Sequence, residues 1–281
     1  MIIIADSGSS KTQWSLIRGS TEPPETIFTS GINPFYQDSP TIVQTLKKEF
    51  PAQNIQADTI FFYGAGCANN RVNSIVSDAL QEFFSASRID VESDLMAAAR
   101  ALCQNSEGIA CILGTGSNSC HYDGKTIVQQ ISPLGFILGD EGSGAVIGKR
   151  LLGDILKNQL PNEIINKFFS KYELTKDDIL ENIYRQPFPN RFAAKFTHFV
   201  YDNVTEPAIY SIVYDEFSRF LVRNVMQYNH ASHLPIHIVG SIGWYFHDIF
   251  EKAASELNLQ TGRFIQAPME GLLQYHNSLI R

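Results

Sequence analysis

The first segment with a chemical signature is DSGSSKT at residues 6–12, which follows an apolar, strand-like run at residues 2–5. It places a carboxylate at the end of a strand, before a turn of small residues whose backbone N–H groups can approach a phosphate closely. A carboxylate beside such a turn repels phosphate unless a Mg²⁺ ion lies between them. The segment therefore indicates a site for magnesium-bound phosphate, although Asp-Ser-Gly alone is also typical of an ordinary hairpin.

A second segment repeats this pattern in the middle of the chain. The apolar run at residues 109–113 enters the turn GTGSN at residues 114–118, and more strand-like sequence follows each turn. The repeat predicts a chain duplicated in its core, with one β-hairpin in each half. The commoner nucleotide signatures do not fit, since GxxxxGK[ST] is absent and the Gly-x-Gly pairs at 64–66, 114–116 and 142–144 lack the third glycine of a dinucleotide fingerprint.

Asp94 is the strongest candidate for a catalytic carboxylate. It lies between a strand-like segment at residues 88–91 and good helix formers at residues 95–102. Ligands bind at this edge in α/β sheets, and a carboxylate there can take a proton from an attacking hydroxyl. Asp is also a good helix N-cap, whose loss costs about 1 kcal/mol, and the two roles are compatible.

Alternating strand-like and helix-like segments must position these residues, and they predict an α/β architecture. Residues 142–250 are mainly helical in pattern, with breaks at prolines. Strands are expected at residues 2–5, 13–17, 26–29, 59–63, 88–91, 109–113, 237–239 and 263–266. Helices are expected at residues 39–50, 72–84, 95–102 and 245–257, and from residue 268.

Composition excludes several classes of protein. The chain has 281 residues, which is length for about two domains, and a formal net charge of −7. This acidic balance argues against nucleic acid and anionic membranes as partners, so a bound anion must be held by backbone amides or a metal ion. The sequence shows neither a signal peptide nor an apolar run of about 18 residues, which predicts a cytoplasmic protein. The four cysteines have no zinc-like spacing, which indicates reduced, buried thiols.

Four motifs in order carry a family resemblance. The segments at residues 6–12 and 114–118, LGDEGS at 138–143 and VGS at 239–241 occur in the order seen in the sugar kinase, Hsp70 and actin superfamily. Together they resemble its branch of BadF/BadG-type ATPases and N-acetylglucosamine kinases. The resemblance implies a duplicated ribonuclease H-like (actin-like ATPase) fold, with two domains around an ATP cleft. We expect a first ATPase-like domain at residues 1–107, completed by helix 268–281, and a second at 108–267.

The resemblance also implies roles for individual residues. Asp6 is expected to bind Mg²⁺, directly or through water, and Asp94 is expected to act as the general base. The expected ATP-binding residues belong to the three turns and are Asp6, Gly8, Ser9, Ser10, Lys11, Thr12, Thr115, Gly116, Ser117, Gly240 and Ser241. The expected sugar-binding residues are Asn33, Asp94, Thr115 and Asp140.

The implied activity is phosphoryl transfer from Mg·ATP to a small sugar, N-acetylglucosamine at its 6-hydroxyl, giving N-acetylglucosamine 6-phosphate and ADP. Kinases of this kind are often dimers through the second domain, so a homodimer is among the expected partners. One alternative is an ATPase that activates a radical 2-hydroxyacyl-CoA dehydratase through an iron–sulfur cluster. Cys111 has the spacing of such activators, but no cysteine follows Cys120. The other alternative is a non-catalytic sugar or nucleotide sensor on the same fold.

Overall fold

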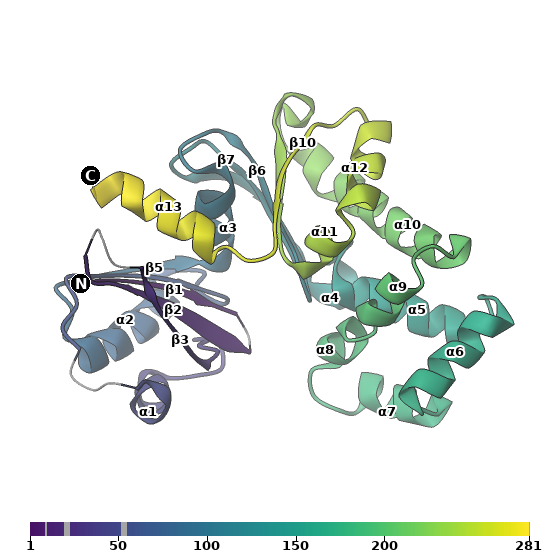
Figure 1. Ribbon diagram of the computed structural model, residues 1–281, viewed down its shortest axis with the longest axis horizontal. Helices are drawn as coiled ribbons and strands as arrows, with labels where there is room; N and C mark the ends of the chain where they lie inside the picture. The colour runs from purple at the N-terminus through teal and green to yellow at the C-terminus, as the bar shows by residue number, and fades with distance from the viewer. Residues whose placement is uncertain (9, 20–22, 52–54, 281) are drawn as a thin grey trace. The chain divides into compact units, whose positions relative to one another are not determined.

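The chain divides into two compact units (Figure 1). The computed structural model describes residues 1–8, 10–19, 23–51 and 55–280. Unit 1 consists of Met1–Asn105 and Pro268–Arg281, and unit 2 consists of Ser106–Ala267. The chain thus leaves unit 1 and returns to it with its last helix, and each unit has a sheet and a core of its own.

Both units are built on a five-stranded sheet of the same topology. The strands of unit 1, in the order β3-β2-β1-β4-β5, are β1 (Ile2–Ser7), β2 (Lys11–Ile17), β3 (Glu25–Ser30), β4 (Thr59–Gly64) and β5 (Arg88–Ser93). The strands of unit 2, in the order β8-β7-β6-β9-β10, are β6 (Gly108–Leu113), β7 (Ser117–Tyr122), β8 (Ile127–Ile131), β9 (Ile236–Val239) and β10 (Thr261–Ile265). In each sheet the first three strands are antiparallel and the last two run parallel to the first. The duplication predicted from the two turns is confirmed.

Helices cover both faces of the unit 1 sheet (Figure 1). One face carries α1 (Ser39–Glu49) and α2 (Asn70–Phe84), and the other carries α3 (Asp94–Cys103) and α13 (Met269–Ile280). Trp14 is fully buried beneath α1 and α2, with the rings of Phe50 and Phe84 each 5.6 Å from its own. On the other face small residues let two helices meet, because a Cβ at Gly271 of α13 would lie 2.4 Å from the Ala101 carbonyl oxygen of α3.

Unit 2 is larger in its helical part. Its helices are α4 (Gly135–Leu138), α5 (Gly144–Leu156), α6 (Asn162–Tyr172), α7 (Lys176–Tyr184), α8 (Pro189–Ala194), α9 (Thr197–Asp202), α10 (Pro207–Arg223), α11 (Ser241–Tyr245) and α12 (His247–Glu256), with 3₁₀ turns at Val225–Gln227 and Ala231–His233. The helix expected at residues 245–257 corresponds to α12, whereas the short helix α11 directly before it was not expected. The chain breaks at Phe246, whose φ of −113° and ψ of 25° leave the helical region while its ring is buried.

Two glycines on α5 give opposite predictions for the same substitution. A Cβ at Gly148 would lie 2.0 Å from the Ala193 carbonyl oxygen of α8, whereas a Cβ at Gly153 would meet nothing within 4 Å. We expect Gly148→Ala to lower the free energy of unfolding by about 1–3 kcal/mol, because the two helices must separate. Gly153→Ala should raise it by about 0.5–1 kcal/mol through helix propensity. Urea denaturation followed by circular dichroism measures both, and equal effects would contradict the α5–α8 contact.

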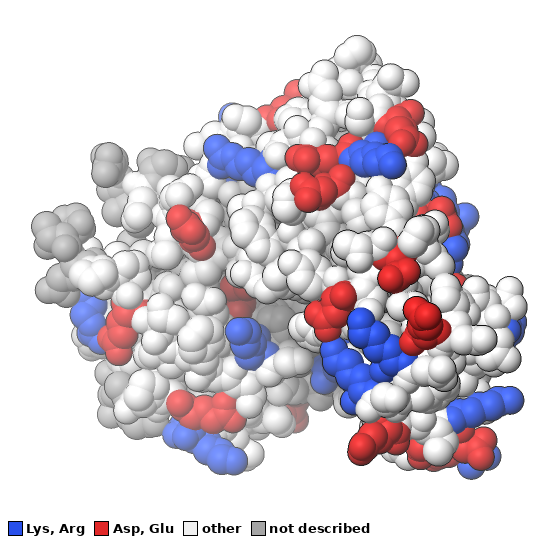
Figure 2. Space-filling view, turned by 45° about the vertical axis from the view of Figure 1, so that its right-hand side comes forward, with Lys and Arg blue, Asp and Glu red and all other residues white. Residues whose placement is uncertain are grey.

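No helix among the described residues has the length and apolar character needed to cross a membrane. Figure 2 shows acidic and basic side chains interspersed over one face, with one local group of Lys and Arg.

Candidate active site

The register of the unit 1 sheet brings the ends of three strands to one edge. Ser7 of β1 is paired with Gly64 of β4, and Gly64 is paired with Ser93 of β5. Because these strands are parallel, their carboxyl ends lie at the same edge of the sheet. Asp6 and Asp94, which are far apart in the sequence, therefore both lie at this edge.

Buried hydroxyl groups hold the first hairpin in shape. The Ser7 and Thr12 hydroxyls are 2.7 Å apart and fully buried, and Ser7 Oγ also bonds both the N–H and the carbonyl of Ile32, at 2.9 and 3.0 Å. Thr12 Oγ1 reaches the Ser30 carbonyl at 3.2 Å. The side chain of Thr12, expected at the phosphates, is thus committed to the interior of unit 1 and supports the hairpin.

The tip of the hairpin is exposed. The Gly8 N–H donates to the Lys11 carbonyl at 3.0 Å, and the Gly31 N–H donates to the Ser10 carbonyl at 3.1 Å. Gly8, Ser10 and Lys11 are exposed, so a ligand can reach them, whereas Ser9 lies outside the described residues.

Asp6 and Asp94 are partly buried carboxylates in an unfavourable environment. Burial, together with repulsion from Asp94, raises the pKa of Asp6 to about 6, although the nearby Lys11 opposes this shift. Burial also raises the pKa of Asp94 to about 6, against the effect of backbone N–H groups at the start of α3. Carboxylates kept at a cost to stability are typical of functional sites.

The residue that caps the N-terminus of α3 is Ser93, not Asp94. Ser93 is the N-cap of α3, since its Oγ accepts the Met96 N–H at 3.1 Å, and Asp94 is the first residue of the helix. An N-cap role for Asp94 is therefore wrong. Its carboxylate still lies at the positive end of the α3 dipole, which stabilises a negative charge there.

The burial of Asp6 gives a stability prediction with a defined sign. Its folded-state pKa of about 6 lies above the ordinary value of 3.8, so the folded protein disfavours the charged form. Asp6→Asn should therefore be more stable than the wild type at pH 7.5, and this advantage should shrink as the pH falls from 6 towards 4. Asp123→Asn is the matched control, because hydrogen bonds lower the pKa of Asp123 and its replacement should destabilise at pH 7.5. Thermal melts at pH 7.5 and at pH 4 measure these differences in stability. An Asp6→Asn variant less stable than the wild type at pH 7.5 would contradict the raised pKa of Asp6.

Asn33 lies against the loop that follows β4, whose residues were not expected to belong to the site. Its Oδ1 accepts the Phe35 N–H at 2.9 Å, and a Cβ at Gly66 would lie 2.3 Å from the same oxygen. Gly66 has a φ of 86°, a region that favours glycine. Cys67 is buried next to it, where burial and the charge of Asp94 raise the pKa of its thiol to about 12. The signal that could have found this loop is its position directly after β4, at the edge where Asp6 and Asp94 lie.

In unit 2 the second turn is attached to the start of α5. The Gly114 N–H donates to the Gly116 carbonyl at 3.0 Å, which closes the turn. The carbonyls of Gly114 and Thr115 accept the N–H groups of Gly144 and Ala145, at 2.8 and 3.0 Å. The first amides of α5 are therefore used by the turn, while Thr115 itself is exposed and Ser117 is buried.

Asp140 lies over this turn. A Cβ at Gly116 would be 3.1 Å from Asp140 Oδ2, and the Asp140 carboxylate accepts a hydrogen bond from the Ser117 backbone. Asp140 has a left-handed φ of 54°, and burial, aided by Glu141, raises its pKa to about 6. The structure thus brings Gly116, Ser117 and Asp140 together within unit 2.

The backbone around residue 240 leaves room only for a glycine. It has a φ of 122°, and a Cβ would lie 2.3 Å from the Leu113 carbonyl oxygen at the end of β6. Its neighbour Ser241 is the exposed first residue of α11. The close approach of β6 and β9 is by itself a sufficient reason for a glycine at position 240. The contact of Gly240 and Ser241 with adenosine therefore stays a prediction.

Comparison with solved structures identifies the family. A protein of Porphyromonas gingivalis assigned as an N-acetylglucosamine kinase is 45% identical, over 99% of this chain and 99% of that one, with a TM-score of 0.93. The chain belongs to this kinase family. It is a carbohydrate kinase, as the resemblance implied. No protein-family model and no curated protein sequence match the chain.

More distant structures support the fold. A Chromobacterium violaceum protein, also assigned as an N-acetylglucosamine kinase, is 15% identical over 98% of both chains, with a TM-score of 0.75. A ROK family glucokinase of Streptomyces griseus, solved with glucose and AMPPNP, is 11% identical over 99% of this chain and 98% of that one, with a TM-score of 0.54. With the repeated sheet topology, these similarities confirm the duplicated ribonuclease H-like fold expected of this carbohydrate kinase.

The cysteines do not favour the dehydratase activator. All four are buried in the described structure, whereas a cluster that passes electrons to a partner must lie near the surface. Among the described residues, no group of His, Cys, Asp and Glu could hold a metal ion by itself.

Proposed function

We propose that the chain transfers the γ-phosphoryl group of Mg·ATP to the 6-hydroxyl of N-acetylglucosamine, giving N-acetylglucosamine 6-phosphate and ADP. The observation that carries the proposal is the 45% identity, over 99% of this chain, to a protein assigned as an N-acetylglucosamine kinase. The geometry of Asp94 is consistent with it, because the carboxylate lies at the ligand-binding edge of its sheet and has a pKa of about 6. A base with this pKa is ionised at neutral pH and can still accept a proton.

In this proposal Asp94 accepts the proton of the 6-hydroxyl as that oxygen attacks the γ-phosphorus. Phosphoryl transfer depends mainly on positioning and charge stabilisation, so the orientation of the hydroxyl matters as much as proton removal. Asn33 and Asp140 would bind ring hydroxyls, which both donate and accept hydrogen bonds. Thr115, which is exposed in the turn beneath Asp140, is proposed to contact both the sugar and the phosphates.

The residues at the first hairpin fit a magnesium nucleotide. Asp6 offers carboxylate oxygens, and its raised pKa reflects burial and a second negative charge rather than a salt bridge. A bound Mg²⁺ supplies positive charge that offsets this repulsion and neutralises the β,γ-phosphates. The exposed Gly8 and Ser10 and the cation of Lys11 would bind the phosphates, with Thr12 supporting the turn from inside.

A coupled assay of ADP release tests the proposal. Purified protein with Mg·ATP should release ADP slowly alone and rapidly with N-acetylglucosamine. N-Acetylmannosamine, glucosamine and glucose are the comparison sugars, and phosphorus NMR of the product identifies the hydroxyl. Rapid ADP release that does not depend on sugar would overturn the kinase proposal in favour of an ATPase. No ADP release with any hexose or amino sugar would overturn it in favour of the non-catalytic sensor.

Two further expectations belong to this proposal. We propose that the protein acts in the cytoplasm, where ATP and the sugar are both present, and as a homodimer through its second domain. Light scattering of the purified protein measures the oligomer, and a monomer at micromolar concentration would contradict the dimer.

A further inference from the structure

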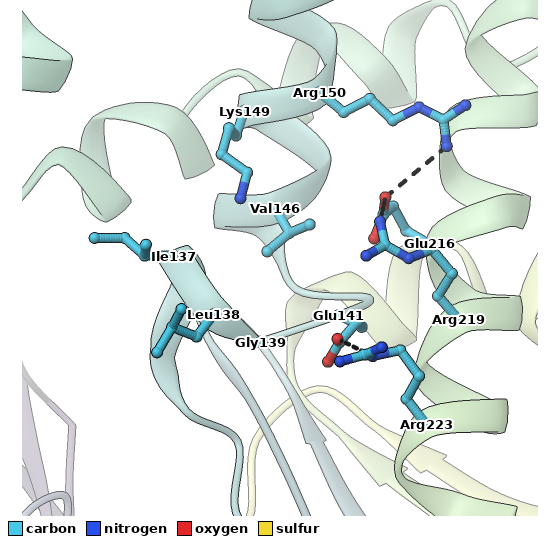
Figure 3. A pocket seen from close by; sticks show the side chains of 10 residues that line it. All are labelled: Ile137, Leu138, Gly139, Glu141, Val146, Lys149, Arg150, Glu216, Arg219 and Arg223. Carbon is cyan, nitrogen blue, oxygen red and sulfur yellow. Dashed lines mark hydrogen bonds and ion pairs between the residues drawn. The ribbon is translucent and has the colours of Figure 1, made fainter.

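The pocket between α4, α5 and α10 of unit 2 is lined by charged side chains that already have partners (Figure 3). Arg223 pairs with Glu141, Arg219 pairs with Glu216 at 3.0 Å, and Lys149 donates to a backbone carbonyl of α4 at 2.7 Å. Their charge is therefore used within unit 2. In unit 1, by contrast, the loop that follows β4 packs directly against a residue of the proposed sugar site.

That residue is Asn33, and its backbone is fixed from two sides. Ser7 Oγ bonds both backbone groups of Ile32, the residue directly before Asn33, at 2.9 and 3.0 Å. The Asn33 N–H donates to Gln37 Oε1 at 2.8 Å, and the Asn33 carbonyl accepts the N–H groups of Tyr36 and Gln37 at 3.0 and 3.1 Å. Because the backbone is held in this way, a group that pushes on the Asn33 side chain must rotate it.

The side-chain amide of Asn33 is held by its oxygen. Its Oδ1 accepts the Phe35 N–H at 2.9 Å, so this oxygen is used within the turn. Its Nδ2 donates no hydrogen bond to any residue in the described part of the chain. An amide nitrogen carries two N–H donors and no acceptor. Asn33 therefore presents a donor to a ligand, and the ligand atom that it binds must be an acceptor.

Gly66, in the loop after β4, lies against the same amide. A Cβ at Gly66 would lie 2.3 Å from Asn33 Oδ1, 3.1 Å from its Cγ and 3.4 Å from its Nδ2, and these are the three atoms that it would meet first. The loop is itself anchored, since the Ala65 N–H donates to the Ser7 carbonyl at 3.0 Å and the Ala68 N–H donates to the Gly66 carbonyl at 2.9 Å. A side chain at position 66 would therefore displace the Asn33 amide rather than the loop.

We propose that Gly66 is a positioning residue for the sugar. Because it has no Cβ, Asn33 can keep its Oδ1 on the Phe35 N–H and present its Nδ2 to an acceptor oxygen of the sugar. This role rests on the proposed function in one respect, the sugar-binding role of Asn33. It adds that the loop after β4 determines the orientation of that side chain, with no contact between Gly66 and the sugar itself.

A double-mutant cycle, measured by calorimetric titration of the full chain with N-acetylglucosamine, tests this role. Asn33→Ala removes the donor and Gly66→Ala displaces it, so each should weaken binding about tenfold, the usual effect of losing one hydrogen bond. The double variant should bind within about threefold of Asn33→Ala, because the atoms that a Cβ at position 66 would meet are then gone. Losses that multiply to about 100-fold, or wild-type affinity in Gly66→Ala, would overturn the role of Gly66.

Steady-state kinetics separates positioning from a general loss of structure. Gly66→Ala should raise KM for N-acetylglucosamine about tenfold while kcat and KM for Mg·ATP stay within about threefold of wild type, as expected when a ground-state binding contact is lost. Gly19→Ala is the matched control in unit 1, since a Cβ there would meet nothing within 4 Å in the described structure, and it should leave all three constants unchanged. Equal increases in both KM values for Gly66→Ala would contradict a role directed at the sugar.

A second substitution covers the case in which Gly66→Ala does not fold. Gly66→Asn has a Cβ that meets the same atoms, but Asn tolerates a positive φ better than Ala does. If both variants fail to fold even in the Asn33→Ala background, Gly66 serves only the fold of its loop and the proposal is overturned. Wild-type protein that binds no hexose or amino sugar would overturn the proposed function together with this role, whereas sugar binding by the wild type with an additive cycle would overturn the role of Gly66 alone.

Discussion

Replacing Asp94 by Asn is expected to lower kcat by about 10²–10⁴-fold, the usual contribution of a general base. Asn keeps the size and hydrogen bonding of the side chain, so the Kd for N-acetylglucosamine should stay within about tenfold of wild type. The wild-type kcat/KM should also fall as the pH drops through 6, because the pKa of Asp94 is about 6 and the protonated form cannot accept the hydroxyl proton. Steady-state kinetics over pH 5–8 and sugar titration measure these effects.

Ser93→Ala is the matched control for Asp94. Ser93 caps α3 directly before Asp94, so its loss should cost about 1 kcal/mol of stability while leaving kcat within a few-fold of wild type. The pair separates a chemical role for Asp94 from a structural role at the helix terminus. A kcat of Asp94→Asn within tenfold of wild type would remove Asp94 from the role of base.

Replacing Asp6 by Asn is expected to lower kcat/KM for Mg·ATP by about 10²–10³-fold, the usual cost of removing one group that stabilises developing charge. The expected cause is weaker placement of Mg²⁺, so the loss should decrease as free Mg²⁺ is raised at constant ATP. Initial rates across a magnesium series measure this. Because the same variant is expected to be more stable at pH 7.5, unfolding cannot account for a loss of activity.

Asp78→Asn controls for the loss of one negative charge in unit 1, since Asp78 is exposed on α2. Its magnesium dependence should match that of the wild type. An Asp6→Asn variant with an unchanged magnesium dependence would place the ion on other ligands, even if its activity were reduced.

Much of the fold could be predicted from local patterns. Apolar runs such as residues 2–5 and 109–113 identify buried strands, and the small-residue turns after them identify the hairpins. The separate short helix α11 could not be predicted, because its end at Phe246 depends on the burial of the Phe246 ring by residues distant in the sequence. Ser93 and Asp94 are both good caps, and the sequence did not determine which of them ends the strand.

The sequence indicated which residues are candidates for the site, but not what their side chains contact. Asp6 and Asp94 could be singled out because each is a carboxylate at the end of a strand, whereas Asp140 was singled out through the family resemblance. The inward role of Thr12 depends on Ser7 and on the carbonyl of Ser30, so no local pattern reveals it.

By itself the sequence determined the α/β class, the duplication and the carboxylates that carry the proposed chemistry, because strand burial and turn geometry depend on neighbouring residues. Only the tertiary structure decided which side chains meet. The parallel register sets Ser7, Gly64 and Ser93 in one row and so brings Asp6 and Asp94 to one edge. Burial at that edge then raises the pKa of both carboxylates, an effect of surrounding atoms that come from distant parts of the chain.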